Sequence, residues 1–404
     1  FMFDSALQIY ERVYEEYPYS EMAPKALYLV AYSAENSFNF EKALKSYQLY
    51  SEKYPDSENT NTAVWNAAFL NERLQNYKKA AEYYKRYYSM NPDEPEGKEA
   101  LYIASDIYKQ SENWKRMIRE KENFISRFRN DSEVINFVMD CFNDIADVYE
   151  KKLNNWPKAR EYYAQMLDFY EALEDKEEYT AYAAHAEFKL LEDDFNEFLE
   201  MKITGRDDEQ LAENLKKKSE KLKELLKAYG EIFNYGVFNY TIASIYKQGR
   251  LYQSFADALF SAEPPSGLSL EEEDIYMEML REQSEPLERQ AVEMYRRAVE
   301  RANELKVFNE WTQKVAERLA AMRPEEYQVG KKPEFVLQYD FESGYAPALS
   351  LNKREKKDYS EQTLGDMPES ISKEDEELEI KGDENSGSVD DEKKVVPESE
   401  EGKE

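Results

Sequence analysis

The sequence predicts an all-α protein that begins as an α-solenoid of antiparallel helix pairs. The main observation is that Pro18, Pro55 and Pro92 are 37 residues apart and follow similar runs of aromatic and acidic residues. A fixed interval of this length is typical of stacked structural repeats. The composition agrees with this prediction, because Gly is scarce, at 12 of 404 residues, while Ala, Leu, Glu and Lys favour helix.

Each period contains two amphipathic segments. In one period the first segment places Leu27, Ala31 and Ala34 at helical spacing, and the second places Ala43 and Tyr47 on one face. The small residues let two helices approach closely, and the aromatic residues fill the space between neighbouring pairs. Each proline then ends the second helix, because it lacks an N–H group and clashes with the preceding turn.

The helix starts are predicted from polar residues. Asp56 or Ser57 and Asp131 or Ser132 are expected to cap the helix that follows them. Ser269, with Glu272 three residues later, predicts a capping box. Together with the period, these signals predict five regions, namely a solenoid at 1–170, irregular longer helices at 171–262, C-terminal helical pairs at 263–332, an extended strap at 333–350 and a disordered acidic tail at 351–404.

The small–aromatic–proline spacing of the second helix resembles the tetratricopeptide-repeat (TPR) family. The residues that carry the resemblance are Ala43, Tyr47 and Pro55, and one period later Ala80, Tyr84 and Pro92. The usual Gly of the first helix is absent, and the unit is longer than the family's usual one. The resemblance implies a solenoid fold and a protein-binding role, without catalytic residues.

Two further resemblances concern location. YQSFADAL, GLSLEEEDIY, EPLERQAVEMY and VFNEWTQKVAERLA resemble large TPR proteins of the bacterial cell envelope, some of them associated with gliding motility. The YPDSE motif resembles outer-membrane TPR lipoproteins. These resemblances imply a periplasmic or outer-membrane-associated protein, and a cytoplasmic location stays open.

The sequence contains little that catalysis needs. His185 is the only histidine and Cys141 the only cysteine, which excludes His-rich metal sites and an internal disulfide. We interpret Cys141 as a small buried hydrophobic residue and His185 as a packed structural histidine. Neither a G-x-G-x-x-G nor a P-loop motif is present. We therefore predict no catalytic residue, no cofactor and no metal site, and so no enzyme.

The charge limits the choice of partner. The formal net charge is −31, and such a surface repels phosphate backbones. We expect no nucleic acid partner, and instead a protein or peptide, in particular a basic one. LKKKSEKLKELLK is a local basic stretch that we interpret as a solvated helix face. No apolar run is long enough to predict insertion into a membrane.

Six aromatic or amide residues are candidates for partner binding. Tyr and Asn combine a flat apolar body or a short side chain with hydrogen-bonding groups, which suits peptide recognition. On the first helices, such residues are expected to line the concave face. In the strap, they would dock on a partner or on the chain's own last helix. The candidates are Tyr32, Asn71, Tyr83, Tyr88, Phe335 and Tyr339.

The leading functional hypothesis is a non-enzymatic scaffold that binds a protein or peptide on the solenoid surface. Two alternatives stay open. One is a self-assembling structural subunit that multimerises through the solenoid ends or the strap. The other is a regulatory subunit of an enzyme.

Overall fold

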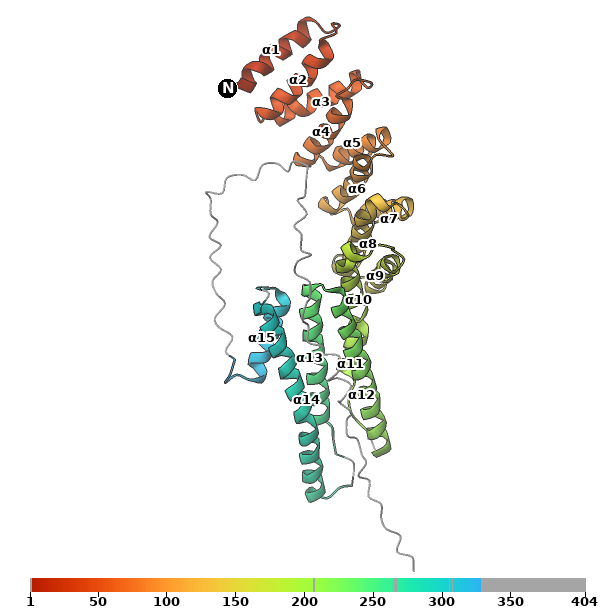
Figure 1. Ribbon diagram of the computed structural model, residues 1–404, viewed down its shortest axis with the longest axis vertical. Helices are drawn as coiled ribbons and strands as arrows, with labels where there is room; N and C mark the ends of the chain where they lie inside the picture. Colours follow the sequence, from red (N-terminus) through yellow and green to blue (C-terminus); the bar gives the residue numbers. More distant parts are fainter. Residues whose placement is uncertain (1, 206–207, 265–266, 305, 307, 328–404) are drawn as a thin grey trace, which may run out of the picture. The chain divides into compact units, whose positions relative to one another are not determined.

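The computed structural model describes residues 2–205, 208–264, 267–304, 306 and 308–327. Throughout these ranges the regular structure is helical, which confirms the predicted all-α fold (Figure 1). The predicted strap and tail lie outside the described residues. The N-terminal half contains the helices α1 (Met2–Glu16), α2 (Ala23–Asn36), α3 (Phe40–Lys53), α4 (Thr60–Arg73), α5 (Tyr77–Met90), α6 (Pro95–Gln110), α7 (Trp114–Phe128), α8 (Ile135–Lys151), α9 (Trp156–Glu171) and α10 (Thr180–Leu190).

Each helix from α1 to α10 packs against the next one along the chain. This pattern of nearest-neighbour contacts is the hallmark of a solenoid. The helices α1, α3 and α5 end at Glu16, Lys53 and Met90, two residues before each of the spaced prolines. The prolines therefore mark the exits from the helix pairs, as predicted.

The core repeats with the same interval. Ala43 and Tyr47 of α3 are fully buried, and so is Ala80 of α5, with Tyr84 exposed by only 2%. The Tyr47 hydroxyl donates to Glu35 over 2.8 Å, and one period later the Tyr84 hydroxyl donates to Glu72 over 3.0 Å. Each tyrosine of the second helix is thus tied to a carboxylate at the end of its own first helix.

In the third period, lysines occupy the positions that tyrosine and glutamate hold in the two earlier periods. Lys121 stands 37 residues after Tyr84, and Lys109 stands 37 residues after Glu72. Lys121 is fully buried, and its ammonium group lies 2.8 Å from Asp144 and 3.4 Å from Asp106. An ion cluster therefore replaces the tyrosine–glutamate pair.

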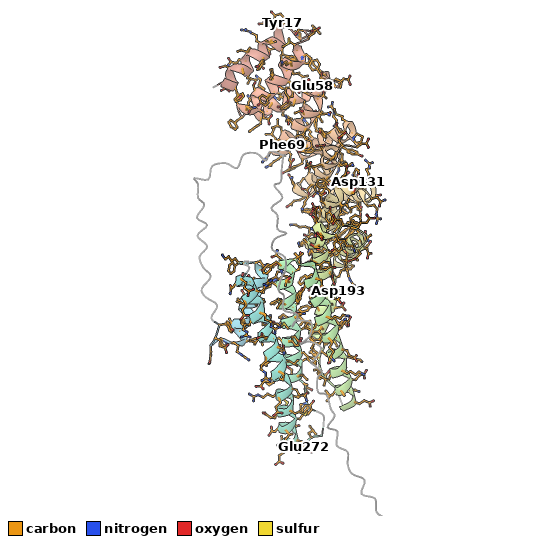
Figure 2. The ribbon with its side chains drawn as sticks, in the orientation of Figure 1. Tyr17, Glu58, Phe69, Asp131, Asp193 and Glu272 are labelled. Carbon is orange, nitrogen blue, oxygen red and sulfur yellow. The ribbon has the colours of Figure 1, made fainter. Side chains whose placement is uncertain are left out.

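The predicted caps are partly wrong. Neither Asp56 nor Ser57 caps α4, because the chain turns at Asn59 and the Thr60 hydroxyl instead donates to the Tyr54 carbonyl oxygen over 2.5 Å. Asp131, labelled in Figure 2, accepts a hydrogen bond from the Glu133 N–H in the short 3₁₀ turn before α8.

A second periodic signal lies in the turn inside each pair. Phe38, Gln75 and Glu112 have positive φ angles of 60°, 58° and 53°. An asparagine follows each of them, and Asn39 and Asn113 accept a hydrogen bond from the backbone N–H three residues later. A left-handed residue followed by an asparagine therefore precedes the second helix in successive periods, and the asparagine side chain caps α3 and α7.

Replacing Glu112 with glycine is expected to stabilise the protein by about 1 kcal/mol, because a left-handed backbone costs a non-glycine residue about 1–2 kcal/mol and the flexibility gained by the unfolded chain offsets part of that. Urea unfolding followed by circular dichroism measures the change. Glu112→Ala is the control and should give no gain. Equal effects of the two substitutions would contradict the strain argument.

The second half contains longer helices and a core of its own. α13 packs against both α12 and α14, and Gly249 lets α13 approach the buried ring of Tyr295, because a Cβ atom there would lie 2.5 Å from that ring. The predicted capping box is confirmed, with Ser269 and Glu272 bonded in both directions. The helices are α11 (Glu192–Glu200), α12 (Asp208–Glu231), α13 (Phe238–Phe260), α14 (Leu270–Glu304) and α15 (Glu310–Met322).

Candidate protein-interaction site

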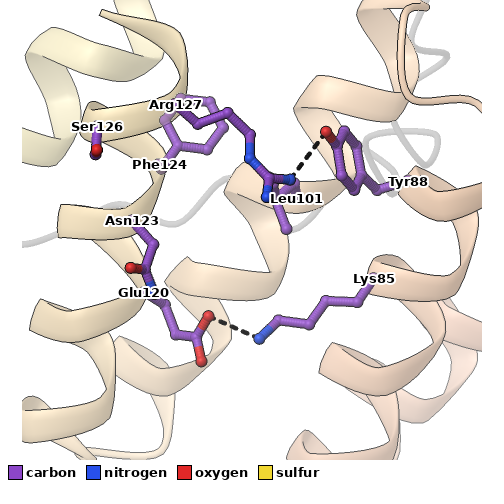
Figure 3. A pocket seen from close by; sticks show the side chains of 8 residues that line it. All are labelled: Lys85, Tyr88, Leu101, Glu120, Asn123, Phe124, Ser126 and Arg127. Carbon is purple, nitrogen blue, oxygen red and sulfur yellow. Dashed lines mark hydrogen bonds and ion pairs between the residues drawn. The ribbon is translucent and has the colours of Figure 1, made fainter.

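A hollow of about 620 Å³ lies between α5 and α7. These are the second helices of successive periods, with the first helix α6 between them. The side chains that line the hollow come from all three helices and are shown in Figure 3, namely Lys85, Tyr88, Leu101, Glu120, Asn123, Phe124, Ser126 and Arg127.

The floor of the hollow is apolar and its rim is polar. Phe124 is exposed by only 1%, and Leu101 is half-buried beside it. Asn123, Ser126 and Arg127 are exposed. A concave surface with an apolar floor and a few convergent polar groups is typical of binding sites for small molecules and for the anchor side chains of peptides.

Two polar contacts join α5 to α7 (Figure 3). The Lys85 ammonium group lies 2.7 Å from the Glu120 carboxylate. About two helical turns further along α7, the Arg127 guanidinium donates to the Tyr88 hydroxyl over 3.0 Å and lies 5.5 Å from the centre of its ring. These contacts fix the two helices at the ends of the hollow and leave its middle open to Asn123 and Ser126.

Positive charge dominates around Glu120. Besides Lys85, Arg119 lies 3.4 Å and Arg116 lies 4.0 Å from its carboxylate. Partial burial raises the pKa of Glu120, but the hydrogen bonds and charges of Lys85 and Arg119 outweigh it, so that the net effect lowers the pKa. One ionised carboxylate is thus shared among three cations.

Of the predicted partner-binding residues that the structure describes, one lies in the hollow. Tyr88 lines it, as described. Tyr83, on the same helix, is half-buried and packs against the cores on both sides of it. Tyr32 of α2 is 45% exposed, with its ring edge-to-face against Phe3.

Asn71 differs from its prediction. It is fully buried, and its amide donates to the Ala67 carbonyl oxygen over 2.7 Å within α4. The prediction that Asn71 lies on the concave surface is therefore wrong, because the helical period places its side chain in the core. Phe335 and Tyr339 lie outside the described residues.

Sequence reasoning missed Lys85, Glu120 and Arg127. A signal for them was present, because Arg116, Glu120, Asn123 and Arg127 recur at spacings of four, three and four residues and so share one face of α7. The sequence alone did not show how many residues along the chain separate side chains that pair between neighbouring second helices. The pairs that bridge the hollow are 35 and 39 residues apart.

The two residues considered for chemistry lie in packed surroundings. Cys141 is fully buried, and burial raises the pKa of its thiol to about 12, which keeps it protonated and unreactive. The His185 Nδ1 lies 2.8 Å from the Asn143 Oδ1, and its ring stacks on Tyr240 with centroids 5.5 Å apart.

We expect the free energy of unfolding to depend on pH because of the buried His185. Burial lowers its pKa to about 4, against the opposing attraction of Asp147. Because the unfolded chain then binds the proton that the folded chain excludes, stability is present above pH 6.5 and is lost as the pH falls toward 4, by about 2–3 kcal/mol.

The variant His185→Gln removes this titration and keeps a polar side chain beside Asn143. Its free energy of unfolding should fall less steeply between pH 6.5 and 4 than that of the parent protein, as measured by urea unfolding at each pH. Parallel curves for the two proteins would show that folding does not lower the pKa of His185.

Within the described ranges, no three His, Cys, Asp or Glu side chains converge in a way that could hold a metal ion. Among the same residues, no helix combines the length and the low polarity that crossing a bilayer requires.

Comparison with known proteins gives a local match and several structural similarities. Residues 25–57 match the tetratricopeptide repeat model. No curated protein matches the chain.

Three solved structures illustrate the structural similarity. A TPR repeats protein from Bacteroides fragilis is 14% identical and covers 74% of this chain and 98% of its own, with a TM-score of 0.33. A tetratricopeptide repeat protein from Parabacteroides merdae is 11% identical, with coverages of 78% and 99% and a TM-score of 0.29. The MamA protein is 18% identical, with coverages of 42% and 83% and a TM-score of 0.30. These similarities add no argument about function.

The matched residues 25–57 contain α2 and α3, one complete helix pair of the 37-residue period. The same tyrosine, alanine and proline positions recur one period later in α5 and its exit. The tetratricopeptide repeat model thus matches one helix pair of the chain, α2 and α3.

Proposed function

We propose that this protein is a non-enzymatic scaffold that binds a segment of another protein in the hollow between α5 and α7. The observation that carries the proposal is the hollow itself, with an apolar floor of Leu101 and Phe124 under a polar rim. Repeat proteins recognise partners along such surfaces, where a few anchors supply most of the binding energy.

Site-specific photo-crosslinking in the native cell tests this proposal. A photoreactive amino acid at Ser126, which is exposed at the rim, should form a crosslink to a discrete protein identified by mass spectrometry. The same amino acid at Lys216, exposed on α12, is the control. A crosslink of equal yield at both positions, or none at Ser126, would contradict the proposal.

A second, basic partner is proposed for the start of α14. Glu271, Asp274 and Glu278 are exposed there, in keeping with the net charge of −31. A basic segment is complementary to this end, and raised salt would weaken its binding. Affinity that does not change with salt would exclude this contact.

Self-association is proposed as an alternative use of the same end of α14. Leu270, Ile275 and Met279 are exposed by 81%, 70% and 44%. Light scattering of the full chain and of Ile275→Glu tests it, since the variant should reduce the mass if this surface joins two copies. A chain that is monomeric with and without the substitution would rule it out.

The proposed location is the bacterial cell envelope. It is supported by the resemblance of the YPDSE and GLSLEEEDIY motifs to envelope-associated TPR proteins. Fractionation of native cells into cytoplasm, periplasm and outer membrane, with an antibody to the full chain, tests it directly. Recovery in the cytoplasm alone would refute the proposal.

A further inference from the structure

We infer that the hollow between α5 and α7 selects an acidic segment of its protein partner, in which two carboxylates flank an apolar anchor residue. The inference rests on the proposed scaffold function and adds the chemical class of the ligand. It is opposite in sign to what the net charge of −31 alone suggests.

The first argument is the local excess of positive charge. α5 carries one acidic residue, Glu82, and α7 carries two, Glu120 and Glu122. The basic residues of the two helices are three times as many, namely Lys78, Lys79, Lys85, Arg86, Lys115, Arg116, Arg119, Lys121 and Arg127. Two adjacent second helices are therefore basic within an acidic chain.

The second argument is the placement of these charges. Arg116 and Arg127 lie on the same face of α7 as Glu120, by the helical period. Lys78 and Lys85, seven residues apart, likewise share a face of α5. Among the side chains that line the hollow, Glu120 is the one acidic group, and Lys85 and Arg127 are the two cations.

The cations at the two ends of the hollow can still form further hydrogen bonds and ion pairs. At one end Lys85 and Arg119 share a single carboxylate, that of Glu120. At the other end, Arg127 contacts the hydroxyl and the ring of Tyr88. A guanidinium carries five N–H donors, so Arg127 can accept a carboxylate without giving up Tyr88.

The distance between the two ends defines the ligand. Residues seven apart on α7, such as Glu120 and Arg127, are about 10 Å apart along the helix axis. In a polyproline II segment, residues three positions apart point the same way and span about 9 Å. A segment with the pattern acidic–x–apolar–acidic would place one carboxylate at each end and its apolar side chain over Phe124 and Leu101.

An acidic peptide fits this surface better than a nucleic acid does. A short peptide interacts mainly with the charges near its binding site, because charges beyond roughly 10 Å are screened at physiological salt. A nucleic acid strand long enough to bind tightly would extend past the basic helices, where the acidic remainder of the chain repels its phosphates. The apolar floor also suits a buried side chain more than a sugar–phosphate backbone.

Fluorescence anisotropy with the full chain and three labelled probes tests the inference. The first probe is a peptide with the sequence Ser-Glu-Ser-Phe-Glu-Ser, and the second has both glutamates replaced by glutamine. The third is an oligothymidine of twenty nucleotides. The acidic peptide should bind about ten-fold more tightly than the glutamine peptide at low salt, and its affinity should fall as salt is raised.

A matched pair of variants locates the binding. Arg119→Gln/Arg127→Gln removes two exposed cations and keeps the Lys85–Glu120 ion pair. Lys216→Gln/Lys227→Gln removes two exposed cations on α12. The first variant should weaken binding of the acidic peptide about ten-fold and the second less than two-fold, with both proteins checked by circular dichroism.

Equal weakening by both variants, equal affinity for the glutamine peptide, or tighter binding of the oligothymidine would overturn the inference. A crosslink at Ser126 to a partner that lacks an acidic segment would also overturn it, while leaving the scaffold function intact. The two proposals can therefore fail separately.

Discussion

Lys121→Ala is expected to lower the free energy of unfolding by about 3–5 kcal/mol, the usual cost of removing one partner from a buried ion pair. The lysine side chain is fully buried, with Asp144 at 2.8 Å and the ring of Tyr102 at 4.5 Å. Burial lowers its pKa, but the attraction of the Asp144 and Asp106 carboxylates outweighs it and raises the pKa above its ordinary value. The substitution would leave a nearly buried Asp144 carboxylate without this partner.

Urea unfolding measures the loss, with Lys216→Ala on the exposed face of α12 as the control. The double variant Lys121→Met/Asp144→Leu should recover more than half of it, because replacing a whole buried pair by apolar residues is far less costly than breaking it. Lys109, which also pairs with Asp144, has a side chain that is 45% exposed and can return to water. A loss below 1 kcal/mol for Lys121→Ala would show that water reaches this cluster.

Tyr84→Ala is also expected to cost about 3–5 kcal/mol, as a large buried aromatic side chain replaced by alanine usually does. The ring is 2% exposed and meets Trp65 edge-to-face at 5.5 Å. Tyr84→Phe, which removes only the hydrogen bond to Glu72, should cost about 1 kcal/mol. Glu72 keeps a hydrogen bond from Gln110 at 2.8 Å.

The equivalent variant one period earlier, Tyr47→Ala, is the internal control. Tyr47 is fully buried and hydrogen-bonded to Glu35 in the same manner. If the helix pairs are equivalent units, urea unfolding should give nearly the same loss for both alanine variants. Losses that differ by more than about 2 kcal/mol, beyond the usual context dependence of such sites, would show that the periods are not equivalent.

The fold could be predicted because the residues that determine it recur at a fixed interval along the chain. Small residues, tyrosine and proline return every 37 residues, and each makes a local contact or marks a chain exit in the structure. The left-handed turn residues Phe38, Gln75 and Glu112 were missed because a positive φ favours glycine and none of the three is glycine. Their periodic signal is the asparagine that follows each of them at the start of the second helix, where no cap was predicted from the sequence.

The site was predictable only in part. Tyr88, one of the predicted candidates, lines the proposed hollow. Lys85, Glu120 and Arg127 were missed because their pairing depends on how far apart along the chain adjacent second helices lie. Asn71 was placed at the surface on residue type alone, and the helical period turns it inward. The total charge was a poor guide to a local surface, since α5 and α7 carry nine basic residues and three acidic ones.

The most direct test of the account is to remove one period. Deletion of residues 58–94 takes out α4 and α5, 37 residues in all, and joins Ser57 to Pro95 in register. The account predicts a protein whose helical circular dichroism and cooperative urea unfolding persist, and which no longer binds the acidic peptide because Lys85 and Tyr88 are gone. Loss of helical structure or of cooperative unfolding in this variant would contradict the claim that the chain is built from interchangeable helix pairs.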